Sequence, residues 1–206
     1  MLHRKRSWNP GMLRSVVGGA VEGLRHTWRR ASGRLRRRAV MARMRPTDIV
    51  LASPRTSRLS PTALLYRLLL RSRYVHAMLY IGGGEVIHTT ARRGVTVDPL
   101  PRKLFDRQHY RIYRVLSLTD EQRQRVVVEA KKLLDWRLDY FALVTNIPAR
   151  WLGRPHPLLR LEKNRLWCSK LIHLAFARAG IELLPGEQVG TVTSEDLGRS
   201  PVLESL

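Results

Sequence analysis

The sequence predicts an α+β domain in which a small antiparallel β-sheet packs with helices. Most β-rich segments lie before residue 116, and two clear helical patterns follow it. Strands grouped apart from helices are typical of α+β domains, whereas strict alternation would indicate a parallel sheet. With 206 residues, of which 44% are hydrophobic, the chain is long enough to bury one well-packed core.

The first 45 residues differ in charge from the rest of the chain. They hold thirteen lysines and arginines against one acid, Glu22, and so carry +12 of the formal charge of +22. Such a charge favours polyanionic surroundings: nucleic acid, anionic lipid or an acidic polymer. Apolar residues recur there at three- and four-residue steps: Leu13, Val16, Val17, Ala20, Val21, Leu24, Trp28, Ala31 and Leu35. We therefore predict a basic amphipathic helical segment over residues 1–45, lying on a membrane surface or packed on a main domain of residues 46–206.

The main domain is predicted to begin with strands. Residues 45–53 indicate a turn followed by a strand that buries Ile49, Val50 and Leu51, and residues 62–71 form an apolar helical pattern. Residues 74–81 and 85–90 are β-rich and are separated by three glycines, which is a hairpin signal. Residues 94–100 and 110–116 are predicted to add two more strands.

Two helices are predicted after the strands. Thr119 with Gln122 three residues later is a capping-box pattern, which predicts a helix from there to about Leu134. Residues 166–180 form a second helical pattern that ends at Gly180. The glycine triplet lacks the Lys-Ser/Thr pair and the following helix of a P-loop, so it indicates a turn rather than a phosphate-binding loop.

Two histidines flank the predicted hairpin. If the three glycines form its loop, His76 lies opposite Thr90 and Met78 lies opposite His88. The two imidazoles then share a face, roughly 7–8 Å apart at the backbone on a diagonal. The opposite face is predicted to be core, with Val75, Ala77, Leu79, Ile81 and Ile87.

The chain has one cysteine, Cys168, so it can form neither an internal disulfide nor a cysteine-rich zinc site. Cys168 lies at the start of a predicted helix, where the helix dipole favours thiolate over thiol. An imidazole beside it would activate the sulfur as a nucleophile. The alternatives are a small buried residue, or a zinc site completed by His109 or His173. We predict no metal and no cofactor.

Four segments, "TDIVLAS", "HAMLYIGGGEVIH", "GVTV" and "WCSKLIHLAFARAG", resemble the circularly permuted branch of the NlpC-type papain-like cysteine hydrolases, the YiiX/YaeF-like group. The resemblance spans about residues 45 to 200 and implies a permuted papain-like fold. The twelve-residue step between the histidines is also similar to that of lecithin:retinol acyltransferase-like enzymes, which move fatty acyl groups. The matched positions are His76, Tyr80 and Gly82 in the H-x-x-x-Y-x-G strand, and Trp167, Cys168 and Ser169 at the helix start.

The resemblance implies a role for each matched residue. Cys168 would be the nucleophile, His76 the base and His88 the group that orients the base. Substrate contacts are expected at Tyr80, Trp167, Ser169 and Tyr140. The chain departs from the group's pattern at Lys170, where an acid is common, and at Asp139-Tyr140, which stand in the reverse order.

We therefore expect a thiol hydrolase or acyltransferase that works through a thioacyl-enzyme intermediate. Its substrate would be a peptide-type amide, such as one in a cell-wall stem peptide, or a lipid acyl ester. The alternative is a non-catalytic basic adaptor that binds anionic membrane or nucleic acid through residues 1–45. No segment indicates a membrane span or a conventional secretory signal, so we expect a cytoplasmic or membrane-associated protein, with an unconventional export route left open.

Overall fold

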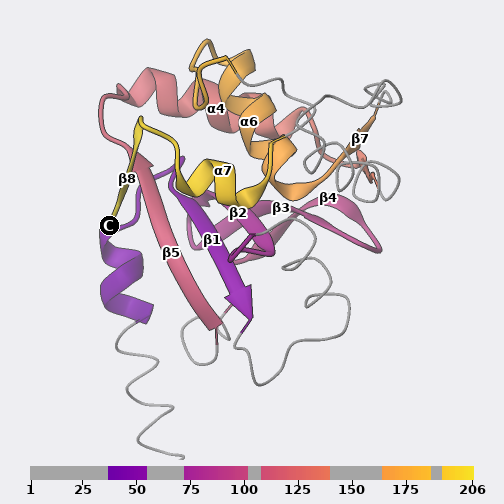
Figure 1. Cartoon of the computed structure of the whole chain (residues 1–206), viewed down its shortest axis with the longest axis horizontal. Coiled ribbons are helices and arrows are strands. Elements are labelled where there is room, and N and C mark those ends of the chain that lie inside the picture. The colour runs from indigo at the N-terminus through magenta and orange to yellow at the C-terminus, as the bar shows by residue number, and fades with distance from the viewer. Residues whose placement is uncertain (1–36, 55–71, 102–107, 140–163, 187–191) are drawn as a thin grey trace, which may run out of the picture.

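The computed structural model describes residues 37–54, 72–101, 108–139, 164–186 and 192–206 (Figure 1). The predicted apolar stripe between Leu13 and Leu35, the predicted helix at residues 62–71 and the side chain of Tyr140 lie outside these residues. Within the basic segment, residues 37–43 are helical. The proposed domain boundary near residue 45 stays a prediction.

The centre of the structure is a six-stranded sheet in the order β4-β3-β2-β1-β5-β8, and each neighbouring pair is antiparallel. A separate parallel pair joins two very short strands, β6 and β7. The general α+β prediction is thus confirmed. The strands are β1 (Ile49–Pro54), β2 (His76–Gly82), β3 (Glu85–Thr90), β4 (Gly94–Pro99), β5 (Gln108–Val115), β6 (Arg137–Leu138), β7 (Arg165–Leu166) and β8 (Leu203–Ser205).

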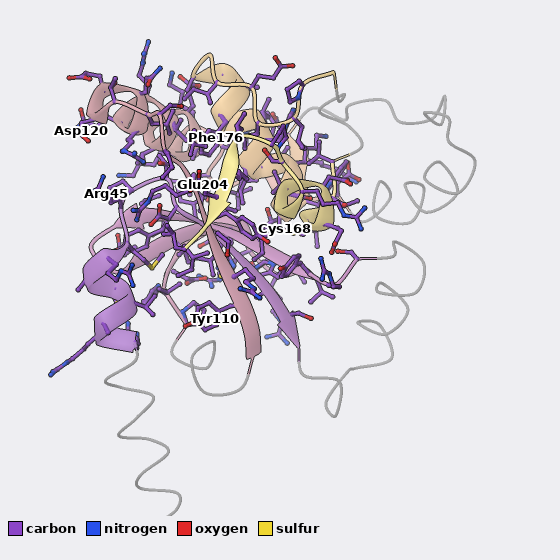
Figure 2. The ribbon with its side chains drawn as sticks, turned by 60° about the vertical axis from the view of Figure 1, so that its left-hand side comes forward. Arg45, Tyr110, Asp120, Cys168, Phe176 and Glu204 are labelled. Atoms are coloured by element: carbon purple, nitrogen blue, oxygen red, sulfur yellow. The ribbon has the colours of Figure 1, made fainter. Side chains whose placement is uncertain are left out.

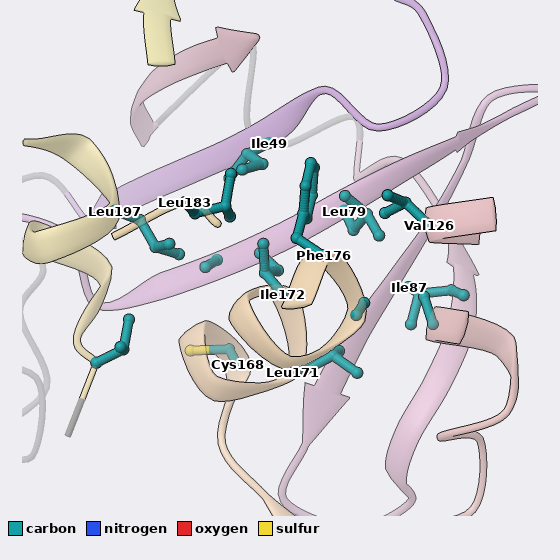
Figure 3. Close-up of a cluster of buried hydrophobic side chains, with 14 of the residues drawn as sticks. Ile49, Leu79, Ile87, Val126, Cys168, Leu171, Ile172, Phe176, Leu183 and Leu197 are labelled. Atoms are coloured by element: carbon teal, nitrogen blue, oxygen red, sulfur yellow. The ribbon is translucent and has the colours of Figure 1, made fainter. Parts of the chain in front are cut away.

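Helices α4 (Asp120–Lys131), α6 (Cys168–Arg178) and α7 (Ser194–Gly198) lie together on one face of the sheet (Figure 1). Between them and the sheet lies the larger core, in which Phe176 and Leu171 of α6 pack on Leu79 and Ile87 (Figure 3). The other face of the sheet holds a second core. Helical residues 37–43 pack against it through Val40 and Met41.

The second core lies on the hairpin face that carries both histidines. That face was expected to be the less apolar of the two, and it buries Met78, Tyr80 and Val86 beside the histidines. The predicted core face is confirmed at Ala77, Leu79 and Ile87, which are fully buried. Both faces of β2 and β3 are therefore covered by apolar side chains.

The β2–β3 hairpin has the predicted register but a shorter loop. Leu79 pairs with Ile87 and Tyr80 with Val86, as predicted. Gly82, however, pairs with Glu85, so only Gly83 and Gly84 lie outside the strands. A bulge between Tyr80 and Gly82 inserts the extra residue and so preserves the predicted pairing.

The helix termini show how well local sequence signals predicted where helices begin and end. Thr119 and Gln122 form the predicted capping box, with Thr119 Oγ1 accepting from Gln122 N at 3.2 Å and Gln122 Oε1 accepting from Thr119 N at 2.8 Å. Helix α4 ends at Lys131, three residues before the predicted end. Helix α7 was not predicted, although Thr193 and Asp196 form a second capping box that marks its start.

Gly94 allows the turn before β4 to approach the segment that leads into β6. Its φ is +66°, and a Cβ placed there would lie 2.1 Å from the carbonyl oxygen of Trp136. The same carbonyl accepts a hydrogen bond from Val95 N at 2.7 Å. The absence of a side chain at this position therefore allows the start of β4 to lie against the residue before β6.

Replacing Gly94 with alanine is expected to destabilise the fold more than the same change at Gly83. Gly83 has a φ of +61°, but a Cβ added to it would meet no atom within 4 Å, so Gly83→Ala bears only the cost of the left-handed backbone, about 1–2 kcal/mol. Gly94→Ala adds a clash with backbone, about 1–3 kcal/mol more. Urea unfolding of the two variants measures the difference, and equal losses would contradict the close approach.

Candidate active site

His76 and His88 are joined directly. His76 is the first residue of β2 and His88 lies within β3, and the hairpin register brings their rings together. His76 Nε2 lies 2.8 Å from His88 Nδ1, and the ring centroids are 5.1 Å apart. The predicted placement of both imidazoles on one face is confirmed.

The structure adds a third group, Asp98 on β4, which the sequence analysis did not identify. Its Oδ2 lies 2.9 Å from His88 Nε2 and accepts a second hydrogen bond from Arg93 Nη2 at 2.6 Å. The signal was present: β3 and β4 form a second hairpin, in which His88 pairs with Thr96. Asp98, two residues along from Thr96, therefore shares the face of His88.

The charge states of the three groups follow from their surroundings. Burial raises the pKa of Asp98, but hydrogen bonds from His88 and Arg93 outweigh it and hold that pKa below its ordinary value. Burial lowers the pKa of His88, and the hydrogen bond to Asp98 only partly offsets this. Burial lowers the pKa of His76 to about 4. At neutral pH the carboxyl is therefore ionised and both imidazoles are neutral.

These charge states fix the tautomers. An ionised carboxylate only accepts hydrogen bonds, so His88 must carry its proton on Nε2 and donate it to Asp98. The Nδ1 of neutral His88 is then an acceptor, so His76 must donate from Nε2. The lone pair of His76 therefore lies on Nδ1. Three residues of three adjacent strands hold this nitrogen unprotonated and able to act as a base.

Cys168 is the first residue of α6 (Figure 2). Its Sγ lies 3.9 Å from Ser194 Oγ, and the backbone of Ala77, the residue after His76, also approaches it. The side chain lies at the edge of the larger core (Figure 3). Burial raises the pKa of the thiol, more than the nearby backbone amides and Ser194 lower it. The expected stabilisation of thiolate by the helix dipole is thus outweighed, and the resting sulfur is a thiol.

Cys168 approaches β2 at the backbone of Ala77, but its thiol is not bonded to the hydrogen-bonded series His76–His88–Asp98, hereafter the histidine chain. Ala77 belongs to the core beneath α6, whereas Met78 belongs to the core on the opposite face, so alternation directs the side chain of His76 away from α6. Within the described part of the chain, no hydrogen bond joins Cys168 Sγ to His76. The structure thus brings together two of the three predicted catalytic residues, His76 and His88, and places the third, Cys168, beside β2.

The residues expected to contact substrate make internal hydrogen bonds. The hydroxyl of buried Tyr80 accepts from Gly84 N at 3.1 Å. Trp167 Nε1 and Ser169 Oγ both donate to the carbonyl of Val192, at 2.8 and 2.7 Å. These bonds tie the first turn of α6 to the segment that precedes α7. Tyr140 lies outside the described residues.

Lys170, which stands where the resembled group commonly has an acid, is buried in this structure. Its Nζ donates to the carbonyl of Arg165 at 3.3 Å and lies 5.0 Å from the centroid of the Trp167 ring. Burial lowers the pKa of its ammonium group, and the charge of Asp139 partly offsets this. Lys170 therefore packs within the start of α6.

The histidine chain is not arranged as a metal site. Both ring nitrogens of His88 are engaged in hydrogen bonds, and one of those of His76 is as well. Among the residues that the structure describes, no group of three or more His, Cys, Asp or Glu side chains is placed to hold a metal ion. The zinc alternative therefore gains no support from this geometry.

No protein-family model matches the chain, and no curated protein matches it by sequence. The fold and the site geometry are therefore what a functional proposal can rest on. Across the described ranges, no helix has both the length and the apolarity needed to cross a bilayer.

Proposed function

We propose that this protein is a cysteine-dependent acyl hydrolase or acyltransferase with a permuted papain-like domain, acting on an ester or amide bond. The observation that carries the proposal is the His76–His88 hydrogen bond, because it leaves an unprotonated imidazole nitrogen at the start of β2. Cys168 begins a helix whose first turn approaches the same strand at Ala77. The non-catalytic alternative depends on residues 1–45, most of which lie outside the described residues.

The proposed reaction begins from a neutral pair. His76 Nδ1 takes the proton of the Cys168 thiol as the sulfur attacks the acyl carbonyl carbon. The tetrahedral intermediate then collapses, and the imidazolium returns the proton to the leaving amine or alcohol. Water, or another acceptor, attacks the resulting thioester by the same route and regenerates the thiol.

The start of α6 is suited to hold the oxyanion. The amides of the first helical turn have no partner within the helix, and Trp167 at the N-cap position makes no side-chain capping bond. The backbone amides of Cys168 and Ser169 already approach the sulfur. They are therefore the donors that would meet an oxyanion formed on a carbonyl attacked by Sγ.

The proposal requires the side chain of His76, which strand alternation directs away from α6, to turn toward Cys168 so that Nδ1 and Sγ come into hydrogen-bond contact. Catalytic hydrogen bonds are often long or poorly aligned in the absence of substrate and tighten in the Michaelis complex. Bonding between Cys168 Sγ and His76 Nδ1 is therefore expected to form when the acyl group occupies the start of α6.

The experiment that tests the proposal compares the wild type with Cys168→Ala on two substrates. Free fatty acid release from anionic phospholipid vesicles tests ester cleavage, and amine release from a cell-wall stem peptide tests amide cleavage. Release by the wild type alone supports the proposal and identifies the bond. Equal release by both proteins would show that Cys168 is not the nucleophile.

The pKa of His76 predicts an unusually acidic limit of activity. Because that pKa is lowered to about 4, His76 stays able to accept a proton well below the ordinary histidine value of about 6.5. The acidic limb of kcat/KM is therefore expected to have its midpoint near pH 4, with folding at each pH checked by circular dichroism. A midpoint near pH 6.5 would contradict the burial of this base.

Asp98→Asn is expected to lower kcat by about a hundredfold or more with little change in KM, because Asp98 is a positioning residue. An asparagine amide that donates to His88 Nε2 would move the proton of His88 to Nδ1 and that of His76 to its own Nδ1, the atom needed as the base. The same change of histidine tautomer explains why Asp→Asn lowers kcat in serine-protease triads. Glu85→Gln, an exposed acid on β3, is the matched control. A change in KM alone would contradict this role.

A further inference from the structure

The hydroxyl group in contact with Cys168 Sγ belongs to Ser194, the first residue of α7. Its Oγ lies 3.9 Å from the sulfur, and the residue is fully buried. In Figure 3 the sulfur of Cys168 points to the side on which α7 lies. Across the described ranges, this contact is the one hydrogen bond that the Ser194 hydroxyl makes. A buried hydroxyl whose single partner is the sulfur is placed to act on that sulfur.

Hydrogen bonds on both sides of Ser194 fix its position in the chain. The first turn of α6 donates two hydrogen bonds to the carbonyl of Val192, which holds the segment before α7 against α6. On the other side, the carboxylate of buried Glu195 accepts from Arg73 N at 2.9 Å and so ties α7 to the residues before β2. The position of the Ser194 hydroxyl beside the sulfur is therefore held by the fold.

The charge on the sulfur changes during the proposed reaction, and a serine hydroxyl can follow that change because it both donates and accepts. The resting thiol of Cys168 can donate to Ser194 Oγ. When the thiol proton moves to His76, the sulfur can only accept hydrogen bonds. The hydroxyl can then rotate and donate to it, and this charge-assisted bond is expected to be shorter than the resting contact.

Burial makes a negative charge on this sulfur costly. Burial raises the pKa of the Cys168 thiol, and the groups that lower it again are backbone amides and the Ser194 hydroxyl. Within the described part of the chain, Ser194 is the one side chain among these donors. A substitution at Ser194 can therefore remove a donor to the sulfur and leave the backbone donors in place.

The titratable side chains on the elements around the sulfur are engaged elsewhere. On β2, His76 is bonded within the histidine chain. On α6, Lys170 donates to a backbone carbonyl, and His173 is buried further along the helix. On α7, Glu195 is paired with arginines and Asp196 accepts the capping bonds of the helix. In the described ranges, none of these side chains forms a hydrogen bond with the sulfur.

We propose that Ser194 is a further catalytic residue of the candidate site, whose hydroxyl donates a hydrogen bond to Cys168 Sγ whenever the sulfur carries negative charge. The catalytic role rests on the proposed function, because that reaction is what charges the sulfur. The hydrogen bond itself belongs to the folded protein and can be measured without a substrate.

The hydrogen bond would act in both halves of the proposed reaction. During acylation, the thiol proton moves to His76 Nδ1 and the sulfur forms its bond to the acyl carbon. Ser194 keeps its own proton throughout and stabilises the charge that develops on the sulfur. During deacylation, the bond between sulfur and carbon breaks and its electron pair returns to the sulfur. Ser194 then donates to the sulfur again until the imidazolium protonates it.

The test measures the thiol pKa of the full-length protein without substrate. Cys168 is the only cysteine, so a carbon-13 label at cysteine Cβ gives one NMR signal that follows the thiol titration. Ser194→Ala is expected to raise this pKa by about one unit, the low end for a hydrogen bond to a charged group, because sulfur is a weak acceptor. Alkylation by iodoacetamide at pH 8 is expected to slow by roughly threefold to tenfold, since less thiolate is present.

Ser200→Ala is the matched control. Ser200 is also a buried serine and lies shortly after α7, but its Oγ donates to the carbonyl of Leu183 at 2.5 Å. This variant is expected to leave both the thiol pKa and the alkylation rate unchanged. Ser194→Gly, which also lacks the hydroxyl, is expected to raise the pKa as Ser194→Ala does. Circular dichroism checks that each variant is folded. An unchanged or lower thiol pKa in Ser194→Ala, or an equal rise in Ser200→Ala, would overturn the proposal.

The same variants separate this inference from the proposed function. If both are correct, Ser194→Ala is expected to lower kcat/KM for acyl release by about tenfold. Acyl release that depends on Cys168, together with an unchanged thiol pKa in Ser194→Ala, would keep the reaction and overturn the role of Ser194. A raised pKa in Ser194→Ala, with no acyl release by the wild type, would support the hydrogen bond and overturn its catalytic use.

Discussion

Replacing His76 with glutamine is expected to lower kcat/KM by about 10²–10⁴-fold, the usual contribution of a general base. Glutamine can still donate a hydrogen bond to His88 Nδ1, so the contact between β2 and β3 is retained. It has no nitrogen that can accept the thiol proton at neutral pH. The substitution thus removes the proposed chemistry and keeps the local structure.

Two observations separate this loss from a loss of fold. The urea midpoint of His76→Gln is expected to stay close to that of the wild type. The acidic limb near pH 4 is expected to disappear from its kcat/KM profile, because the group that titrates there is gone. A loss of less than twofold, or an unchanged acidic limb, would assign the proton transfer to another residue.

Replacing Asp48 with asparagine is expected to lower the free energy of unfolding by about 3 kcal/mol or more. Asp48 is fully buried, and its carboxylate accepts two hydrogen bonds of 2.7 Å from the Nε and Nη2 of Arg114. It also accepts from Arg45 N at 2.8 Å. Removing one charge of a buried pair leaves the other uncompensated, which typically costs about 3–5 kcal/mol. Arg114 connects β5 to the start of β1 through this bond, so the variant weakens the centre of the sheet.

Asp120→Asn is the control for this prediction. Asp120 is fully exposed and lies 3.9 Å from Arg123, so its loss is expected to leave the urea midpoint unchanged. Both variants should keep the slope of the unfolding curve, since neither changes the surface that unfolding exposes. Equal midpoints for Asp48→Asn and Asp120→Asn would show that the buried pair contributes no net stability.

The local elements of the fold were predictable because each has a strong local signal. The β2–β3 register followed from hairpin parity, and α4 followed from the Thr119 capping box. The end-to-end order of the sheet was not predictable. Strand β8 pairs with β5 although some ninety residues separate them, and no local pattern indicates such a partner.

The candidate site likewise has parts that could be predicted from the sequence and parts that could not. The pairing of His76 with His88 followed from counting residues around a turn, since both lie on one hairpin. Asp98 could have been found by the same counting on the β3–β4 hairpin. The resting charge of Cys168 could not be foreseen, because it depends on how deeply α6 packs on the sheet, and burial outweighs the helix dipole there.

The most direct test of the central claim is intact-protein mass spectrometry after rapid mixing with p-nitrophenyl butyrate. Cys168 is the only cysteine, so a thioester can form at one place only. We expect one butyryl group per chain, mapped to the peptide that holds Cys168 and removed by hydroxylamine, and formed at least about a hundredfold more slowly in His76→Gln. A butyryl group on another residue, or formation on Cys168 at the same rate in His76→Gln, would contradict a cysteine nucleophile served by the His76–His88–Asp98 chain.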